Sequence, residues 1–139
     1  MANQTYLLEV VTPERVVVNE EVEVTSAPGT EGSLGILADH APMLTALNIG
    51  LLEYGKHGEN KKLTITGGFL EVANNKVTVL ATAAEKVQEI DLSRAEAARR
   101  RAEQRIEKAQ TGNSEVDIDR AEMALKRALL RLEAAKHNQ

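Results

Sequence analysis

The sequence predicts an α+β protein with two domains, an antiparallel β-sandwich over residues 1–85 and an antiparallel two-helix hairpin over residues 86–139. The first observation is compositional: all prolines, all aromatic residues and every glycine except Gly112 precede residue 85. The second is the spacing of apolar residues, which repeats every two positions before this point and every three or four positions after it. A change of composition and of period at one place indicates a domain boundary.

Short β-strands account for the first part. Segments rich in Val, Ile, Leu and Thr lie at residues 6–11, 16–26, 62–72 and 76–82, and turn-forming Pro, Gly and Asn residues bound them. The clearest hairpin is "EVANNKVTV", because Asn tolerates the positive φ that a tight turn between twisted strands requires. Several short strands with no helical segment among them predict a sandwich or a flattened barrel.

Two helices account for the second part. From Leu92 onward the only Gly or Pro is Gly112, so we expect a helix, the short turn "TGNS" and a second helix packed antiparallel to the first. An alanine-rich seam buries little apolar area, so the hairpin should be weakly held and able to open. The predicted seam consists of Ala95, Ala98, Ala102, Ile106 and Ala109 on the first helix and Ile118, Ala121, Leu125, Ala128, Leu132 and Ala135 on the second.

Arginines border this seam. Arg94, Arg101 and Arg131 each immediately precede a seam residue, so the three should line one edge of the closed hairpin. Arg127 lies one turn before Arg131. Like charges on one edge oppose closure, whereas a bound polyanion would favour it, because guanidinium groups match phosphate oxygens. The alternative is an ordinary solvated face whose arginines form ion pairs with Glu96, Glu103 and Glu107.

The composition argues against several classes of function. There is no cysteine, and His40, His57 and His137 are scattered along the chain, so we predict neither catalytic residues nor a metal site. No glycine-rich phosphate loop is present, and we expect no enzymatic activity from the chain itself. No apolar stretch approaches the roughly twenty residues that span a bilayer, so we expect no direct membrane insertion. With a net charge of −4, we also expect no nucleic-acid partner.

Five segments, taken together, are typical of one protein family. They are "EGSLGILADHAPMLTAL" (31–47), "TGGFLEV" (66–72), "KVTVLATAAE" (76–85), "IDLSRA" (90–95) and "AEMALKRALLRLEAA" (121–135). In this order and combination they resemble the epsilon subunit of the bacterial F-type ATP synthase. The resemblance runs through essentially the whole chain. It implies a ten-stranded N-terminal β-sandwich followed by a two-helix domain, in agreement with the periodicity.

The resemblance implies a place in a rotary motor that transports hydrogen ions and makes ATP. The sandwich would lie at the foot of the central stalk, against the gamma subunit and the c-ring, at the cytoplasmic face of the bacterial plasma membrane. The loop "GSLGILADHAP" resembles the segment that approaches the ring. The rotor-interface positions that follow are Ser33, His40, Ala41, Pro42 and Met43.

The resemblance also implies a regulatory role for the helices. In this family the compact hairpin permits ATP hydrolysis, and the extended helices suppress it by reaching the catalytic beta and alpha subunits. No cofactor is required, but in several bacterial members the compact form binds ATP as a regulatory ligand through an Ile/Leu-Asp-x-x-Arg-Ala motif, which "IDLSRA" matches. The nucleotide-binding positions implied here are Glu85, Ile90, Asp91, Arg94, Arg101, Arg127 and Arg131.

Two interpretations remain open at the level of sequence. Asp91 is also well placed to cap the first helix, and capping is compatible with a nucleotide contact. The chain as a whole has an alternative function, a free-standing ATP-sensing module without a rotor partner. That alternative explains the arginines but leaves the loop at residues 31–47 unexplained.

Overall fold

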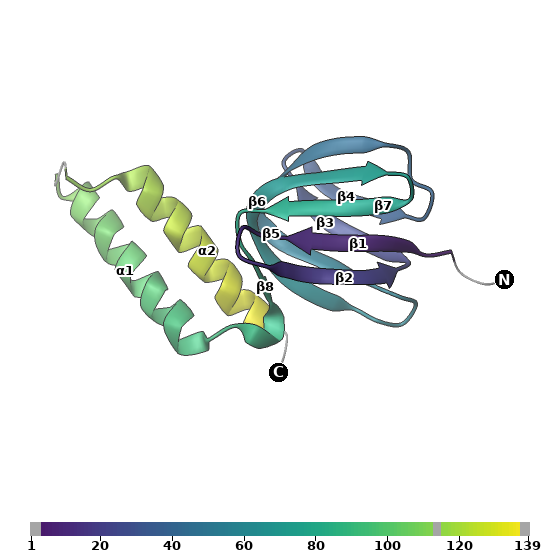
Figure 1. The fold of residues 1–139 in the computed structure, drawn as a ribbon. Helices are drawn as coiled ribbons and strands as arrows, with labels where there is room; N and C mark the ends of the chain where they lie inside the picture. The colour runs from purple at the N-terminus through teal and green to yellow at the C-terminus, as the bar shows by residue number, and fades with distance from the viewer. Residues whose placement is uncertain (1–3, 113–114, 137–139) are drawn as a thin grey trace. The chain divides into compact units, whose positions relative to one another are not determined.

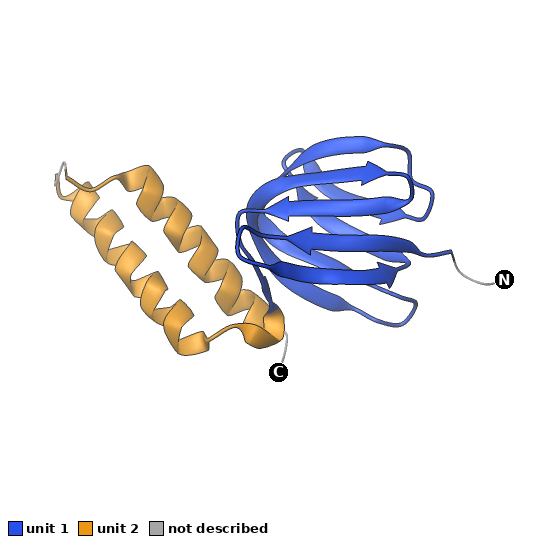
Figure 2. Ribbon diagram, in the orientation of Figure 1, with its two compact units in different colours: residues 1–86 blue, residues 87–139 orange. Residues whose placement is uncertain are grey.

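The computed structural model describes residues 4–112 and 115–136, and the chain divides into two compact units, residues 1–86 and 87–139 (Figures 1 and 2). The boundary drawn from the sequence lies one residue earlier. Asn113 and Ser114 of the predicted turn, together with His137, lie outside the described residues. Within the described part, neither helix is long and apolar enough to cross a bilayer.

The first unit is built of antiparallel strands with one exception. The predicted sandwich is confirmed, but β1 pairs with β7 in the parallel direction. The segment 16–26 forms two strands that separate at Glu23. The sheet order is β2-β1-β7-β6-β5-β3-β4, and β8 pairs with β6. The strands are β1 (Tyr6–Val11), β2 (Val16–Val22), β3 (Val24–Gly29), β4 (Gly32–Leu37), β5 (Met43–Gly55), β6 (Lys61–Ala73), β7 (Lys76–Ala81) and β8 (Ala84–Lys86).

Two long strands pass through both layers of the sandwich. β5 and β6 have 13 residues each and pair with one another from Met43↔Val72 to Tyr54↔Lys61. The second half of β6 pairs with β7 and its first half with β8, while β5 pairs with β3 at residues 53–55 and again at Leu47. The described residues contain eight strands, two fewer than the ten that the family resemblance implies, and β5 and β6 each run unbroken for 13 residues.

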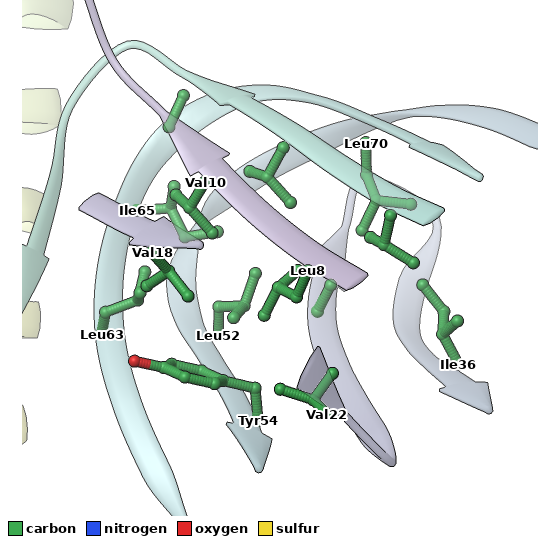
Figure 3. Packing of buried hydrophobic residues seen from close by; sticks show 14 of the residues in the cluster. Leu8, Val10, Val18, Val22, Ile36, Leu52, Tyr54, Leu63, Ile65 and Leu70 are labelled. Atoms are coloured by element: carbon green, nitrogen blue, oxygen red, sulfur yellow. The ribbon is translucent and has the colours of Figure 1, made fainter. Parts of the chain in front are cut away.

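The core lies between the two layers. Alternate residues of each strand face inward because side chains in a strand point to opposite faces in turn. Leu8, Leu52, Leu63, Ile65 and Leu70 are fully buried there (Figure 3). Every member of this cluster belongs to residues 6–84, so the core of the first unit is complete without the helices.

The Asn-Asn hairpin is confirmed. β6 and β7 join at Asn74 and Asn75, whose φ angles of 51° and 57° are both positive. Two successive residues in this region give a turn whose twist matches that of the flanking strands. Asn adopts it more readily than most residues.

The second unit is the predicted helical hairpin, preceded by a short 3₁₀ turn. The turn η1 spans Val87–Glu89, α1 spans Leu92–Gln110 and α2 spans Ile118–Lys136. Five alanines of the predicted seam are buried, and the remaining predicted seam residues are partly buried. Ala134 is buried as well, outside the predicted seam, and α2 contacts η1. The buried alanines of the predicted seam are Ala95, Ala102, Ala121, Ala128 and Ala135.

Candidate functional site

Asp91 caps the first helix. Its Oδ1 accepts a hydrogen bond from the Arg94 backbone N–H at 3.1 Å, and its carbonyl oxygen accepts one from the Ala95 N–H at 3.0 Å. This is the ordinary way to satisfy the unpaired N–H groups of a first helical turn. Ile90, half-buried, donates its N–H to the Val87 carbonyl at 3.3 Å. The motif "IDLSRA" therefore has a structural role of its own at the start of α1.

One side of α1 is basic. Each residue advances about 100° around a helix, so positions seven apart lie nearly above one another. Arg94 and Arg101 follow this rule and flank the buried Ala95 and Ala102 on the same side. Both arginine side chains are exposed. The predicted edge of the seam is therefore present on the first helix.

The basic side of α2 faces the same way. In an antiparallel pair, residues that lie just before a seam position on each helix fall on the same side. Arg127 and Arg131 stand just before Ala128 and Leu132 and are half-buried. At the turn of the hairpin, Arg105 and Arg120 line one common cavity whose lining also includes Glu115 and Asp117, so this end carries charges of both signs. The structure thus brings arginines from both helices onto one face.

On the opposite face of the hairpin, the charged side chains form ion pairs. Arg99 binds Glu96 and Glu103 through its guanidinium group, and Arg100 lies 3.8 Å from Glu96. These contacts hold the pKa of the Glu96 carboxyl below its usual range, and the carboxylates raise that of Arg99, in each case mainly through the hydrogen bonds. The solvated-face interpretation therefore applies to Arg99 and Arg100.

Three arginines of the predicted phosphate edge lack such pairs. Within residues 4–112 and 115–136, no ion pair involves Arg94, Arg101 or Arg127. Of the glutamates considered as partners from the sequence, Glu107 makes no ion pair within these residues. The described residues also contain no cluster of His, Asp and Glu suited to a metal ion. Positive charge on this face is left available to a ligand.

Glu85 stands apart from the other predicted nucleotide-binding residues. It lies on β8 in the first unit, whereas the remaining six belong to the second unit. Its backbone carbonyl accepts a hydrogen bond from the Thr64 hydroxyl at 3.4 Å, within the pairing of β8 with β6. The backbone of Glu85 therefore contributes to the edge of the sandwich.

The predicted rotor-interface residues fall into two places. His40, Ala41 and Pro42 lie in the loop between β4 and β5, and Met43 begins β5. The His40 Nδ1 atom is 2.7 Å from the Ala41 carbonyl oxygen, a contact inside the loop. Ser33 lies near the start of β4, roughly 13 Å from the loop end of that strand at about 3.3 Å per residue. The structure brings four of the five residues together and leaves Ser33 apart.

An exposed apolar strip on the sandwich was missed in the sequence. Phe69 and Leu80 are directly paired across β6 and β7, and Phe69 also pairs with Ala46 on β5. Their exposed fractions are 56% for both Phe69 and Leu80, and 70% for Leu44 on the same strand as Ala46. The signal was available, because Leu70 and Val72 face the core and period two then turns Phe69 outward. Apolar side chains gathered on a surface indicate a place of contact with another protein.

Known protein families match both units. The model of the ATP synthase delta/epsilon chain beta-sandwich domain matches residues 5–87, and that of the delta/epsilon long alpha-helix domain matches residues 88–136. The chain belongs to the ATP synthase delta/epsilon family. Within that family it is an epsilon subunit of the F-type ATP synthase central stalk, as its curated relatives indicate.

Two relatives illustrate the similarity to other epsilon chains. The ATP synthase epsilon chain of Pelotomaculum thermopropionicum is 56% identical over 108 residues, which cover 78% of this chain and 81% of the relative. The epsilon chain of Carboxydothermus hydrogenoformans is 57% identical over 99 residues, covering 71% and 74%. Identity at this level over most of both chains makes the family assignment secure.

Solved structures of ATP synthases contain similar chains. A chain in the mitochondrial ATP synthase of Euglena gracilis, determined as OSCP, F1 and c-ring, has a TM-score of 0.78 and 27% identity. The match covers 96% of this chain and 82% of that one. A chain in the central stalk and c-ring of the Tetrahymena thermophila enzyme shares the fold, with a TM-score of 0.60, 17% identity and coverage of 97% and 99%.

Proposed function

We propose that this epsilon subunit joins the rotor through its sandwich and restrains ATP hydrolysis through its helices, and that ATP holds the helices in the closed hairpin. The observation that carries the proposal is the contrast between the two faces of the hairpin. Arg99 is fully engaged by carboxylates on one face, whereas Arg94, Arg101 and Arg127 gather on the other without ion pairs among the described residues.

The energetics of the seam suit such a switch. The buried residues of the two helices are all alanines, which bury little apolar area, while alanine favours the helix even without a partner. Clustered arginines oppose closure further, and a bound triphosphate reverses this opposition by accepting charge-assisted hydrogen bonds. A ligand at one hundred times its dissociation constant would stabilise the closed form by about 2.7 kcal/mol. That is enough to shift an equilibrium between closed and open helices by roughly a hundredfold.

In this proposal, different residues contact different parts of the nucleotide. Arg94 and Arg101 contact the phosphates from α1, and Arg127 and Arg131 contact them from α2. Ile90 and Asp91 lie toward the adenine and ribose, and the Asp91 carboxylate keeps one oxygen on its capping bond. Glu85, which the family resemblance also implies, lies on β8 in the first unit. Because donors come from both helices, neither helix alone would bind well.

In the open form the same basic residues have another use. Separated helices reach the catalytic beta and alpha subunits, where arginines attract an acidic surface over a distance and then pair with it. ATP and the catalytic head therefore compete for one set of charges. The subunit controls hydrolysis without catalysing it.

The sandwich supplies the rotor contacts at the cytoplasmic face of the bacterial membrane. We assign the β4–β5 loop, with His40, Ala41, Pro42 and Met43, to the c-ring. Ser33 belongs to the same resemblance but stands at the other end of β4. The exposed strip of Leu44, Phe69 and Leu80 supports a contact with the gamma subunit, since it leaves a large apolar surface without cover in the first unit.

Calorimetric titration of the isolated chain with ATP tests the nucleotide site. Arg101→Gln removes one charge-assisted hydrogen bond worth about 1.5–3 kcal/mol, so the affinity should fall roughly tenfold to a hundredfold. Arg127→Gln should do the same from the other helix. Arg100→Gln is the matched control, because Arg100 is exposed on the opposite face and close to Glu96. Absence of binding at millimolar ATP, or equal losses at Arg100 and Arg101, would refute the site.

The proposed rotor contact has its own test, which also addresses the free-standing sensor considered from the sequence. Tagged chain purified from its natural host should bring down a gamma-like subunit if the rotor contact is right. ATP binding without any such partner would favour the sensor instead.

A further inference from the structure

The loop between β4 and β5 is held from outside itself. This loop, residues 38–42, connects β4 to β5, the two strands that flank β3 in the sheet. The hydroxyl of Tyr6, on β1, lies 3.0 Å from the Ile36 carbonyl oxygen just before the loop. Within the loop, the backbone N–H of Asp39 donates to the side-chain oxygen of Asn75 at 2.8 Å.

Asn75 uses both ends of its amide. While Oδ1 accepts from Asp39, the Nδ2 group donates to the Thr5 carbonyl oxygen at 3.0 Å. Thr5 directly precedes β1, and Asn75 lies in the β6–β7 turn. One side chain therefore ties together three segments that are separated by 36 and 70 residues in the sequence.

The backbone at both partners is unusual. Asp39 has φ of 62°, in the left-handed region that only a few residue types adopt readily. Asn75, at 57°, is in the same region because the tight turn requires it. Such a conformation in a short loop persists when surrounding contacts determine it. The turn geometry at Asn75 directs its side-chain amide toward the loop, and the amide then holds the loop at Asp39.

We propose that Asn75 is a positioning residue, which holds the β4–β5 loop in the conformation that meets the rotor. The inference rests on the proposed contact of this loop with the c-ring. Asn75 itself need not touch the ring. By ordering His40 and its neighbours in the unbound chain, Asn75 reduces the conformational entropy that the loop loses on binding. Preorganisation of this kind strengthens binding without a new contact.

The neighbouring asparagine provides a matched control. Asn74→Gly and Asn75→Gly both place glycine at a positive φ that glycine adopts freely, so both should keep the hairpin turn. Only Asn75→Gly removes the amide that binds Asp39. Asn75→Asp is a conservative variant, because its carboxylate still accepts from the Asp39 N–H while the bond to Thr5 is lost.

Two measurements on the full chain test the proposal. Hydrogen exchange of the Asp39 amide, followed by NMR, should accelerate about threefold to tenfold in Asn75→Gly, the equivalent of one ordinary hydrogen bond. It should stay near the wild-type rate in Asn74→Gly and Asn75→Asp. Affinity for ATP synthase depleted of this subunit should fall by a similar factor in Asn75→Gly only.

The possible results separate the two levels of inference. Equal exchange rates of the Asp39 amide in the two glycine variants would refute the proposal that the Asn75 amide holds the loop. Faster exchange with unaltered affinity in Asn75→Gly would refute its role in positioning the loop. Failure of the wild-type chain to bind the depleted complex would instead refute the proposed rotor contact. The exchange data would still decide whether Asn75 holds the loop at Asp39.

Discussion

Tyr6→Phe is the substitution whose effect the structure defines most closely. The Tyr6 side chain is 3% exposed, and its hydroxyl lies 2.6 Å from the Thr25 hydroxyl and 3.0 Å from the Ile36 carbonyl oxygen. Phenylalanine fills nearly the same space but leaves these buried groups without their partner. Such a loss destabilises a protein by about 1–3 kcal/mol. For a unit of this size the Tm of the sandwich should fall by roughly 5–20 °C.

The same residue makes a prediction about pH. Burial raises the pKa of Tyr6 above its ordinary value of 10.0, and the hydrogen bond with Thr25 opposes part of this increase. A raised pKa in the folded state means that the unfolded chain releases the proton first. The contribution of Tyr6 to stability is therefore complete below about pH 10 and decreases as the pH rises from there toward the folded pKa. Phenylalanine has no such dependence, so the difference between wild type and Tyr6→Phe should narrow above about pH 10.

Urea denaturation between neutral pH and about pH 11 measures both effects, since the free energy of unfolding follows from the midpoint and slope. A Thr25→Val variant and the double variant complete a cycle, in which we expect a coupling energy of about 0.5–3 kcal/mol. Wild-type stability in Tyr6→Phe at neutral pH would show that the hydroxyl contributes nothing. A stability difference that stays constant to pH 11 would contradict the effect of burial on the pKa of Tyr6.

Three further outcomes are expected. A chain that ends at Lys86 should unfold cooperatively when followed by circular dichroism, and it should still join the rotor. ATP hydrolysis by the complex should no longer be restrained; hydrolysis that remains regulated would show that the helices are not the inhibitory element. Ala102→Leu and Ala128→Leu add bulk at seam positions that are each 1% exposed, so each should destabilise the closed hairpin by about 1–3 kcal/mol and lower disulfide cross-linking between engineered cysteines on the two helices; an unchanged yield would contradict close packing. Phe69→Lys should weaken binding to the gamma subunit, whereas Val16→Lys, at a similarly exposed position, should not, and equal effects would rule out a specific role for the strip.

The helices were the part of the fold best determined by the sequence. Their length follows from the absence of glycine and proline, and their seam follows from local spacing. Ala95 and Ala128 are buried where the spacing places them. The Asn-Asn turn was equally accessible, because its conformation depends on two adjacent residues.

The arrangement of the strands was harder to predict because it depends on distant pairings. The parallel pairing of Leu8 with Val77 joins residues almost seventy positions apart, and no local pattern reports such a pair. The path of β5 and β6 through both layers is also a property of the whole sheet.

The candidate sites were predictable to different degrees. Helical spacing placed Arg94 and Arg101 on one edge, but which arginines pair with carboxylates depends on the packed hairpin. The bond from Asp39 to Asn75 could not be foreseen, because each residue reads alone as an ordinary turn residue. Local patterns therefore placed the candidate residues, whereas their hydrogen bonds and ion pairs depend on tertiary contacts.

The course of β5 and β6 through both layers has a mechanical consequence. Along almost their whole length these strands are joined to one another by a continuous antiparallel ladder, from Met43↔Val72 to Tyr54↔Lys61. Backbone hydrogen bonds in such a ladder run across the strands. A force that slides one layer over the other must therefore deform these two hydrogen-bonded strands together, whereas two separately formed sheets would resist only through side-chain packing. A torque that enters the sandwich on one layer reaches the other through the backbone itself.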